Sequence, residues 1–455
     1  MGARSWISLV VAATASVFPL GCIPTLPLRH LSYDAVAAPP ISRARLEFAA
    51  AAESPANSSL ADLIDIAGQH HPDLRWARGR IESARGQFIQ AGLYPNPIIG
   101  PRITQLGHGE NNWGEAGATF TQTIVTKNKL GLARQAAERG IEAADWRAIT
   151  KWNDVVTRVR LTYFELLTVK RELETLKNIL RVSEDAVKTA ETLEKAGAGN
   201  RPDVLRARVE LEQNRLRWNV SLRRAEAASQ NLFTSLGRPK IALEDLLPKD
   251  GRELDVAPPE FDWNCMVEHL REISSELQEA RAVIVQNERL IAKAQADVTP
   301  NVDVNLIPYY AAYDQEMRGL VAVTVPLPIY DRNQGNIRAA KGNYARVIAE
   351  EQQVELRLID GLTVAYQRYQ ANRQQANTFR EVIVPQARES LKLVEAGYRG
   401  GDKKYDYTTV LQAQQILFQA QLNEAQALGE LWRSVSEIAG ILQQSQLDAG
   451  CMARR

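Results

Sequence analysis

Long hydrophobic runs are missing from most of this 455-residue sequence. After Cys22, no stretch reaches the roughly 18 apolar residues that a membrane-spanning helix needs. An excess of one charge is missing too, because 55 Lys and Arg residues nearly balance 54 Asp and Glu residues. The sequence therefore predicts neither a helical membrane anchor nor general attraction to nucleic acid or to an anionic membrane surface.

Residues typical of catalytic and metal sites are also scarce. The sequence has three cysteines, which define no disulfide framework, and five histidines, none of them spaced to bind a metal together with cysteines or carboxylates. No catalytic triad, phosphate-binding loop or dinucleotide-binding fingerprint stands in a suitable context. We therefore expect no enzyme activity, no cofactor and no metal site. The histidines are His30, His70, His71, His108 and His269.

The N-terminus has the layout of a secretory signal. Arg4 is followed by an apolar stretch from Trp6 to Leu20, and then by Gly21 and Cys22. This stretch is short for a membrane span, so we predict a signal peptide at residues 1–21 and an exported chain. The ending "LGC" resembles the cleavage box of bacterial lipoproteins, in which the cysteine carries lipid. Cys22 is therefore a candidate lipid attachment site, and cleavage elsewhere, with an unmodified Cys22, is the alternative.

A Pro-Asn corner occurs twice in the chain. Pro95-Asn96 and Pro300-Asn301 lie 205 positions apart (300 − 95), a little under half of the sequence, which predicts an internal duplication. Each half is expected to contain a helix, a β-hairpin, a long helix, a glycine-containing turn and a returning helix. The predicted segments are a signal peptide (1–21), a Pro/Ala-rich linker (22–59), a first repeat (60–239), a connector (240–262), a second repeat (263–442) and a polar C-terminal tail (443–455).

The long helices have the pattern of coiled coils. Residues 127–197 are rich in helix formers, and they contain a ladder with alternating steps of four and three positions. A helix of about 70 residues measures roughly 100 Å, which is too long for a compact globular domain. The ladder consists of Val155, Val159, Thr162, Leu166, Val169, Leu173, Leu176 and Leu180.

The two hairpins supply only four strands per chain. A transmembrane barrel needs at least about eight strands to close without exposed edges, so several chains must share one barrel. Three chains give about twelve strands, with twelve helices continuing from them. The predicted fold is mainly α with a membrane β-barrel: a trimeric, twelve-stranded barrel on a long α-helical tunnel, built from a duplicated repeat.

These residues resemble the TolC family of outer-membrane efflux channels. The resemblance rests on "LYPNP" and "FTQTIVTKNKLGLARQAAE" around the first hairpin, on "VTVPLPIYDRNQGNIRAA" after the second, and on the paired turns "AGAGNRPDVLRA" and "YRGGDKKYDYTTVLQAQ". It covers roughly residues 60–442. It implies a homotrimer in the outer membrane with a periplasmic tunnel, which docks on a periplasmic adaptor protein and an inner-membrane pump, expected to be of the RND type.

The resemblance also implies where the channel is gated. The turns at Gly197 and Gly401 are expected to form the periplasmic tip, where Asp203 would face Tyr398 and Lys403 and hold the aperture closed. A simpler alternative is that Asp203 only caps the returning helix. An acidic box that some members carry is missing, because Thr409 and Gln412 occupy its positions. The expected junctions between strands and helices are Pro95, Pro300, Pro326 and Pro328.

Two other classes and several substrates remain as alternatives. A structural coiled-coil protein would explain the heptads but not two hairpins at matching points of a repeat. A periplasmic scaffold lipoprotein would explain Cys22, but adaptors usually carry one helical hairpin flanked by small β-domains. The segments around the first hairpin look closest to the branch that serves cation-exporting resistance systems. Metal cations are therefore favoured slightly over drugs, other small molecules or secreted proteins.

Overall fold

A computed structural model describes residues 58–104, 114–197, 199–237, 252–312, 315–400 and 404–444. The signal peptide, Cys22, Gly401 and Lys403 lie outside the described residues. The first repeat contains α3 (Ser58–His70), α4 (Pro72–Ala91), β1 (Ile98–Thr104), β2 (Glu115–Ile124), α5 (Lys129–Lys195) and α6 (Arg201–Ser235).

The second repeat has the same order of elements. It contains α7 (Trp263–Ile273), α8 (Ser275–Ala296), β3 (Val302–Ala311), β4 (Glu316–Thr324), α9 (Gln334–Thr378), α10 (Val384–Arg399) and α11 (Tyr407–Ile441). A short 3₁₀ helix, η1 (Arg252–Asp255), precedes it, and a π-helical turn, η2 (Phe379–Ile383), separates α9 from α10. The prediction of a mainly helical, duplicated chain with one hairpin per repeat is confirmed.

Three local features were not predicted. The first helix of repeat one is divided at buried His71, whose Nδ1 accepts the N–H of Asp73 and caps α4 at 3.2 Å. The long helix expected in the second repeat contains the π turn, which ends two residues before Pro385 of α10. Proline lacks an N–H and crowds the preceding turn, which explains the local widening of the helix. Cys265 is disulfide-bonded, and both other cysteines lie outside the described residues.

The four strands form one antiparallel sheet in the order β1-β2-β3-β4. Successive residues of a strand point to opposite faces, so the register assigns each cross-strand row to one face. One face carries the apolar row Ile99, Phe120, Leu306 and Val321. The next row, on the other face, is Ile98, Thr121, Asn305 and Ala322, and further along this face lie Arg102, Gly117, Tyr309 and Arg318. The sheet therefore has an apolar face and a polar face.

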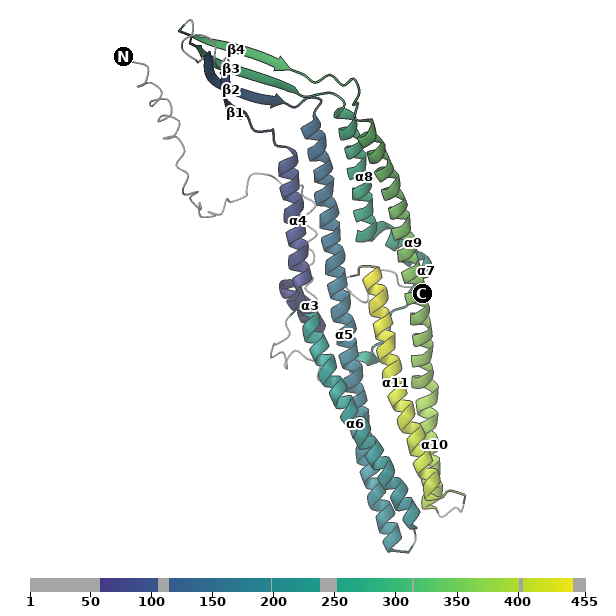
Figure 1. Cartoon of the computed structure of the whole chain (residues 1–455). Helices are drawn as coiled ribbons and strands as arrows, with labels where there is room; N and C mark the ends of the chain where they lie inside the picture. Colours follow the sequence, from purple (N-terminus) through teal and green to yellow (C-terminus); the bar gives the residue numbers. More distant parts are fainter. Residues whose placement is uncertain are drawn as a thin grey trace, which may run out of the picture. The chain divides into compact units, whose positions relative to one another are not determined.

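The helices pack as a layer that joins the two repeats (Figure 1). Helix α5 contacts α4, α6, α8 and α11, and α9 contacts α8 and α11. The largest core cluster combines side chains of α3, α5, α9 and α11, among them Leu63, Tyr163, Tyr369 and Val435, all fully buried. No helix in the described part of the chain is long and apolar enough to cross a membrane.

Candidate functional site: the paired turns at the tip

Both turns that face away from the sheet begin a returning helix with a polar cap. The side chain of Asn200 accepts the N–H of Asp203 at 3.0 Å, and Asp406 accepts the N–H of Thr409 at 2.8 Å. Asn200 and Asp406 lie 206 positions apart (406 − 200), so they occupy equivalent places in the two repeats. The hydroxyl of Thr409 donates to Asp406 as well, and this hydrogen bond is the main cause that lowers the pKa of Asp406.

The cap of α6 shows that Asp203 is not the capping residue of this helix. Asp203 lies in the first turn of α6 and uses only its backbone N–H in the cap, so the alternative in which Asp203 caps the helix is wrong. Its carboxylate is 3.6 Å from the guanidinium of Arg206. Gly197 follows α5 with a φ of +72°, a left-handed conformation that glycine adopts without steric cost. The N–H of Gly199 then reaches back to the carbonyl of Leu193 at 3.0 Å.

Two tyrosines of the second repeat lie against the first repeat. The Tyr407 hydroxyl donates to the carbonyl of Ala186 at 2.7 Å, and its ring centroid is 6.0 Å from that of Tyr398. Burial, followed by the neighbouring Tyr398 and Asp203, raises the pKa of Tyr407 to about 12. Burial and the charge of Asp203 also raise the pKa of Tyr398. Asp203 is thus close enough to act on Tyr398 electrostatically, although no hydrogen bond joins them among the described residues.

Two further polar contacts join the repeats near the tip. Arg206 donates to the hydroxyl of Thr408 at 2.8 Å, and the side chain of Gln415 donates to Glu210 at 2.6 Å. Sequence reasoning did not identify these residues. A signal was present nearby, because Asn214 follows Val204, Ala207 and Leu211 in steps of three and four and so continues a buried seam with a polar side chain.

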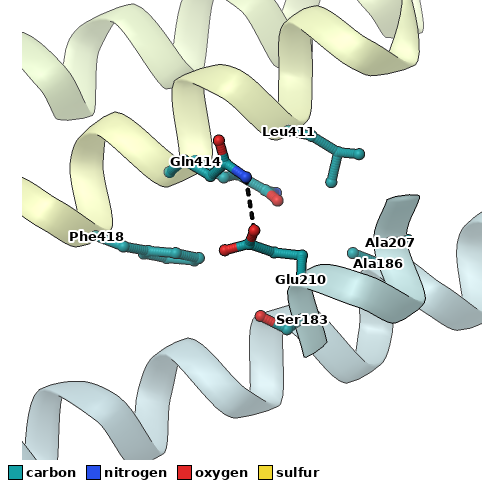
Figure 2. A pocket seen from close by; sticks show the side chains of 8 residues that line it. Ser183, Ala186, Ala207, Glu210, Leu411, Gln414 and Phe418 are labelled. Atoms are coloured by element: carbon teal, nitrogen blue, oxygen red, sulfur yellow. Dashed lines mark hydrogen bonds between the residues drawn. The ribbon is translucent and has the colours of Figure 1, made fainter. Parts of the chain in front are cut away.

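A small cavity lies beside the Glu210 contact (Figure 2). Three helices enclose it, and its volume of about 10 Å³ leaves room for roughly one water molecule. Figure 2 shows Glu210 pointing into the space between α6 and α11, and the dashed line that ends on it is the hydrogen bond donated by Gln415, which carries no label there. The lining residues are Ser183, Ala186, Ala207, Glu210, Leu411, Gln414, Gln415 and Phe418.

A buried carboxylate joins the same three helices farther from the tip. Glu172 of α5 is 3% exposed, and it accepts hydrogen bonds from Arg224 of α6 at 2.9 Å and from Gln426 of α11 at 3.1 Å. Because a buried charge needs several partners, this cluster stabilises one particular arrangement of α5, α6 and α11. Like the contacts near the tip, it joins α5 and α6 of the first repeat to α11 of the second.

The predicted junction prolines lie between helices and strands. Pro95 is between α4 and β1, and its carbonyl accepts from Gln122 at 3.1 Å. Pro300 is between α8 and β3, and its carbonyl accepts from the hydroxyl of Thr126 at 2.7 Å. Pro326 and Pro328 follow β4. The carbonyls of the two corner prolines thus bind side chains from the end of β2 and the segment after it.

Within the described residues, no group of three or more His, Cys, Asp or Glu side chains is arranged to hold a metal ion. The polar residues near the tip form helix caps, ion pairs and hydrogen bonds between the two repeats. Such contacts can stabilise or release one arrangement of helices.

A duplicated helical layer, with a two-faced sheet at one end and two helix-connecting turns at the other, is the architecture of an outer-membrane channel. The chain belongs to the outer membrane efflux protein family, also called the TolC family, whose profile matches residues 63–238 and 266–442. Proteins of this family are transport channels and not enzymes, and they form trimers with a periplasmic helical tunnel.

Two characterised relatives show how far the similarity extends. The chain is 24% identical to the cobalt-zinc-cadmium resistance protein CzcC of Cupriavidus metallidurans over 379 residues, which cover 83% of this chain and 88% of that protein. It is also 24% identical to the pyoverdine export outer membrane protein OpmQ of Pseudomonas putida over 428 residues, with coverages of 84% and 85%.

Solved structures share the fold at lower identity. The outer-membrane channel OprN has a TM-score of 0.70 at 18% identity, covering 85% of this chain and 90% of that one. The outer membrane protein VceC of Vibrio cholerae has a TM-score of 0.68 at 18% identity, with coverages of 84% and 95%.

Proposed function

We propose that this chain is the exit duct of a tripartite efflux system and conducts metal cations passively to the exterior. The likeness to CzcC, which extends over most of both chains, favours this substrate class. The comparable likeness to OpmQ keeps export of a small organic molecule as the second candidate. Export of drugs or secreted proteins is a further alternative, because one channel can serve different pumps and the pump selects the transported substrate.

The observation that carries the channel function is the two-faced sheet. Strands β1 and β4 are both edge strands of the four-stranded sheet, and an unpaired edge needs a partner. Three copies can pair edge to edge into one closed sheet, with the apolar row of Val321 toward lipid and the polar row of Asn305 toward the lumen. A single chain cannot enclose a pore in this way.

The gate of this channel is the tip. Asp203, Tyr398 and Lys403 remain our proposed gate residues, and the contacts of Arg206 and Tyr407 support a closed arrangement of the two turns. In the proposed assembly, a periplasmic adaptor and an inner-membrane pump of the RND type engage the tunnel. Cys22 is the proposed lipid attachment site of the mature chain.

Deletion of the gene in its native host tests the proposed substrate. We expect lower tolerance to one or more of cobalt, zinc, cadmium and copper ions, with tolerance to dyes and detergents unchanged, and we expect the intact gene to restore growth. Growth inhibition is measured over a concentration series of each compound. Unchanged metal tolerance contradicts the metal version, and loss of pyoverdine or dye export then supports the second candidate.

A further inference from the structure

Glu210 lies where the α5–α6 pair meets α11, about two helical turns from Asp203. Its carboxylate accepts from Nε2 of Gln415 on α11 at 2.6 Å and from Nδ2 of Asn214 on its own helix at 3.3 Å. Asn214 is fully buried, and the same Nδ2 donates to the hydroxyl of Ser183 on α5 at 2.9 Å. The Glu210 carboxylate therefore connects α6 with α11 directly, and Asn214 extends this connection to α5.

Near Glu210, α6 has more polar contacts to α5 than to α11. Helices α5 and α6 are joined near the tip by the buried Asn214–Ser183 hydrogen bond and by two ion pairs between the helices. Helix α11 is held to this pair by the side chains of Gln415 and Thr408, which contact α6, and by the Tyr407 hydroxyl, which donates to α5. We therefore expect α11 to separate from the α5–α6 pair more easily than α5 separates from α6. The two ion pairs are Arg208–Glu191, at 2.6 Å, and Arg215–Glu184, at 3.4 Å.

We propose that Glu210 and Gln415 form a second latch, which holds α11 against the α5–α6 pair and keeps the tip closed. This inference rests on the proposed gated channel. A charged acceptor makes a stronger hydrogen bond than a neutral one, and the adjoining cavity has room for only about one water molecule to replace a lost donor. Asn214 remains as a donor to Glu210 after Gln415 leaves, so the carboxylate keeps a partner in the open state.

A charge exchange tests the latch in planar bilayers at pH 8. Gln415→Glu places two carboxylates opposite each other, and we expect the open probability to rise by about tenfold or more, because the repulsion is repeated in each chain of the trimer. The double variant Glu210→Gln with Gln415→Glu restores one amide and one carboxylate. We expect its open probability to return to within about twofold of the parent, since the same hydrogen bond forms in reverse.

Glu212→Gln is the matched control, because Glu212 lies on the same helix and, among the described residues, pairs only with the exposed Arg215, at 2.8 Å. It should keep the parent's open probability. If Gln415→Glu fails to assemble, Gln415→Met removes the donor without adding a charge and should still raise the open probability. Parent-like gating in either Gln415 variant, or a charge exchange that restores nothing, overturns the latch. A parent protein that inserts as a trimer yet conducts nothing overturns the channel function instead.

Discussion

Asp145 of α5 has a carboxyl group whose burial disfavours its charged form. Its Oδ1 is buried and has no hydrogen-bond partner within the described part of the chain. Burial raises its pKa to about 6 from the ordinary value of 3.8; the nearby Arg85 opposes this shift, and Glu142 adds to it. The folded state therefore favours protonated Asp145 more than the unfolded state does.

The sign of the pH effect follows from that shift. A raised pKa contributes stability that is fully present below about pH 4, is lost as the pH rises toward 6, and is absent above it. We expect Asp145→Asn, which cannot ionise, to be more stable than the parent at pH 8 and equal to it near pH 4. Chemical unfolding of the trimer in detergent, followed by the helical circular dichroism signal at both pH values, measures the difference.

Asp154→Asn is a suitable control for this prediction. Asp154 lies on the same helix but is half exposed and pairs with Lys151 at 2.8 Å. Exposed pairs of this kind contribute little, so the variant should differ from the parent by less than about 1 kcal/mol at both pH values. If Asp145→Asn shows the same small difference at pH 8 and at pH 4, then Asp145 is solvated in the assembled channel and the proposed burial is wrong.

Helices α5 and α11 approach each other at two glycines. A Cβ on Gly429 would lie 2.0 Å from the hydroxyl oxygen of Thr168, and one on Gly440 would lie 2.3 Å from that of Thr157. Both the glycines and the threonines are eleven positions apart (440 − 429 and 168 − 157), which is three helical turns and keeps each pair on one face. The two antiparallel helices therefore approach closely at two points, and each point requires a glycine on α11.

Alanine at Gly429 should separate these helices. We expect Gly429→Ala to lower the free energy of unfolding by about 1–3 kcal/mol, because the short, branched Thr168 cannot move away without leaving its own hydrogen bond to Phe164. Gly342→Ala in α9 is the control, since no atom of another element in the described part of the chain lies within 4 Å of its Cβ position. There, alanine should stabilise the helix by up to about 1 kcal/mol. Equal effects at the two positions contradict the close approach of α5 and α11.

At the scale of elements, the sequence was sufficient for the order and type of the helices and strands. Alternating apolar residues and heptads are local patterns, and the corners at Pro95 and Pro300 mark where one pattern replaces the other. The ladder from Val155 to Leu180 indicated one seam, whereas this part of α5 packs against both α6 and α11. The second seam could not be separated from the first by periodicity alone, because residues of both recur at the same heptad spacing.

The contacts at the tip could not be predicted in the same way. Arg206 and Thr408 are 202 positions apart, and they meet only because α6 and α11 have particular rotations about their axes. The cap was assigned to Asp203 as an alternative because Asp is a good cap, but Asn200 stands three positions earlier, where the helix begins. The resemblance to a family located the site at the turns, while the partners of each side chain required the three-dimensional structure.

At the scale of the whole molecule, the sheet decides how the chain meets the membrane. The four side chains of its apolar row are between 41% (Phe120) and 67% (Ile99) exposed on this single chain. An apolar surface of this size is costly in water and favourable against lipid. The adjacent row, with Thr121 and Asn305 joined by a hydrogen bond of 2.6 Å, is suited to a water-filled lumen.

Two neighbouring substitutions test this orientation directly. Val321 and Ala322 are consecutive residues of β4, so their side chains point to opposite faces of the sheet. A lysine facing lipid near the middle of a bilayer costs about 2–4 kcal/mol, and a lysine facing the lumen costs little. We therefore expect Val321→Lys to reduce the heat-sensitive trimer extracted from outer membranes by at least about tenfold, while Ala322→Lys leaves its amount within about twofold of the parent. The trimer is measured by electrophoresis of unheated and heated membrane extracts. Equal losses in the two variants contradict a lipid-facing row at Val321, and loss only in Ala322→Lys reverses the assignment of the faces.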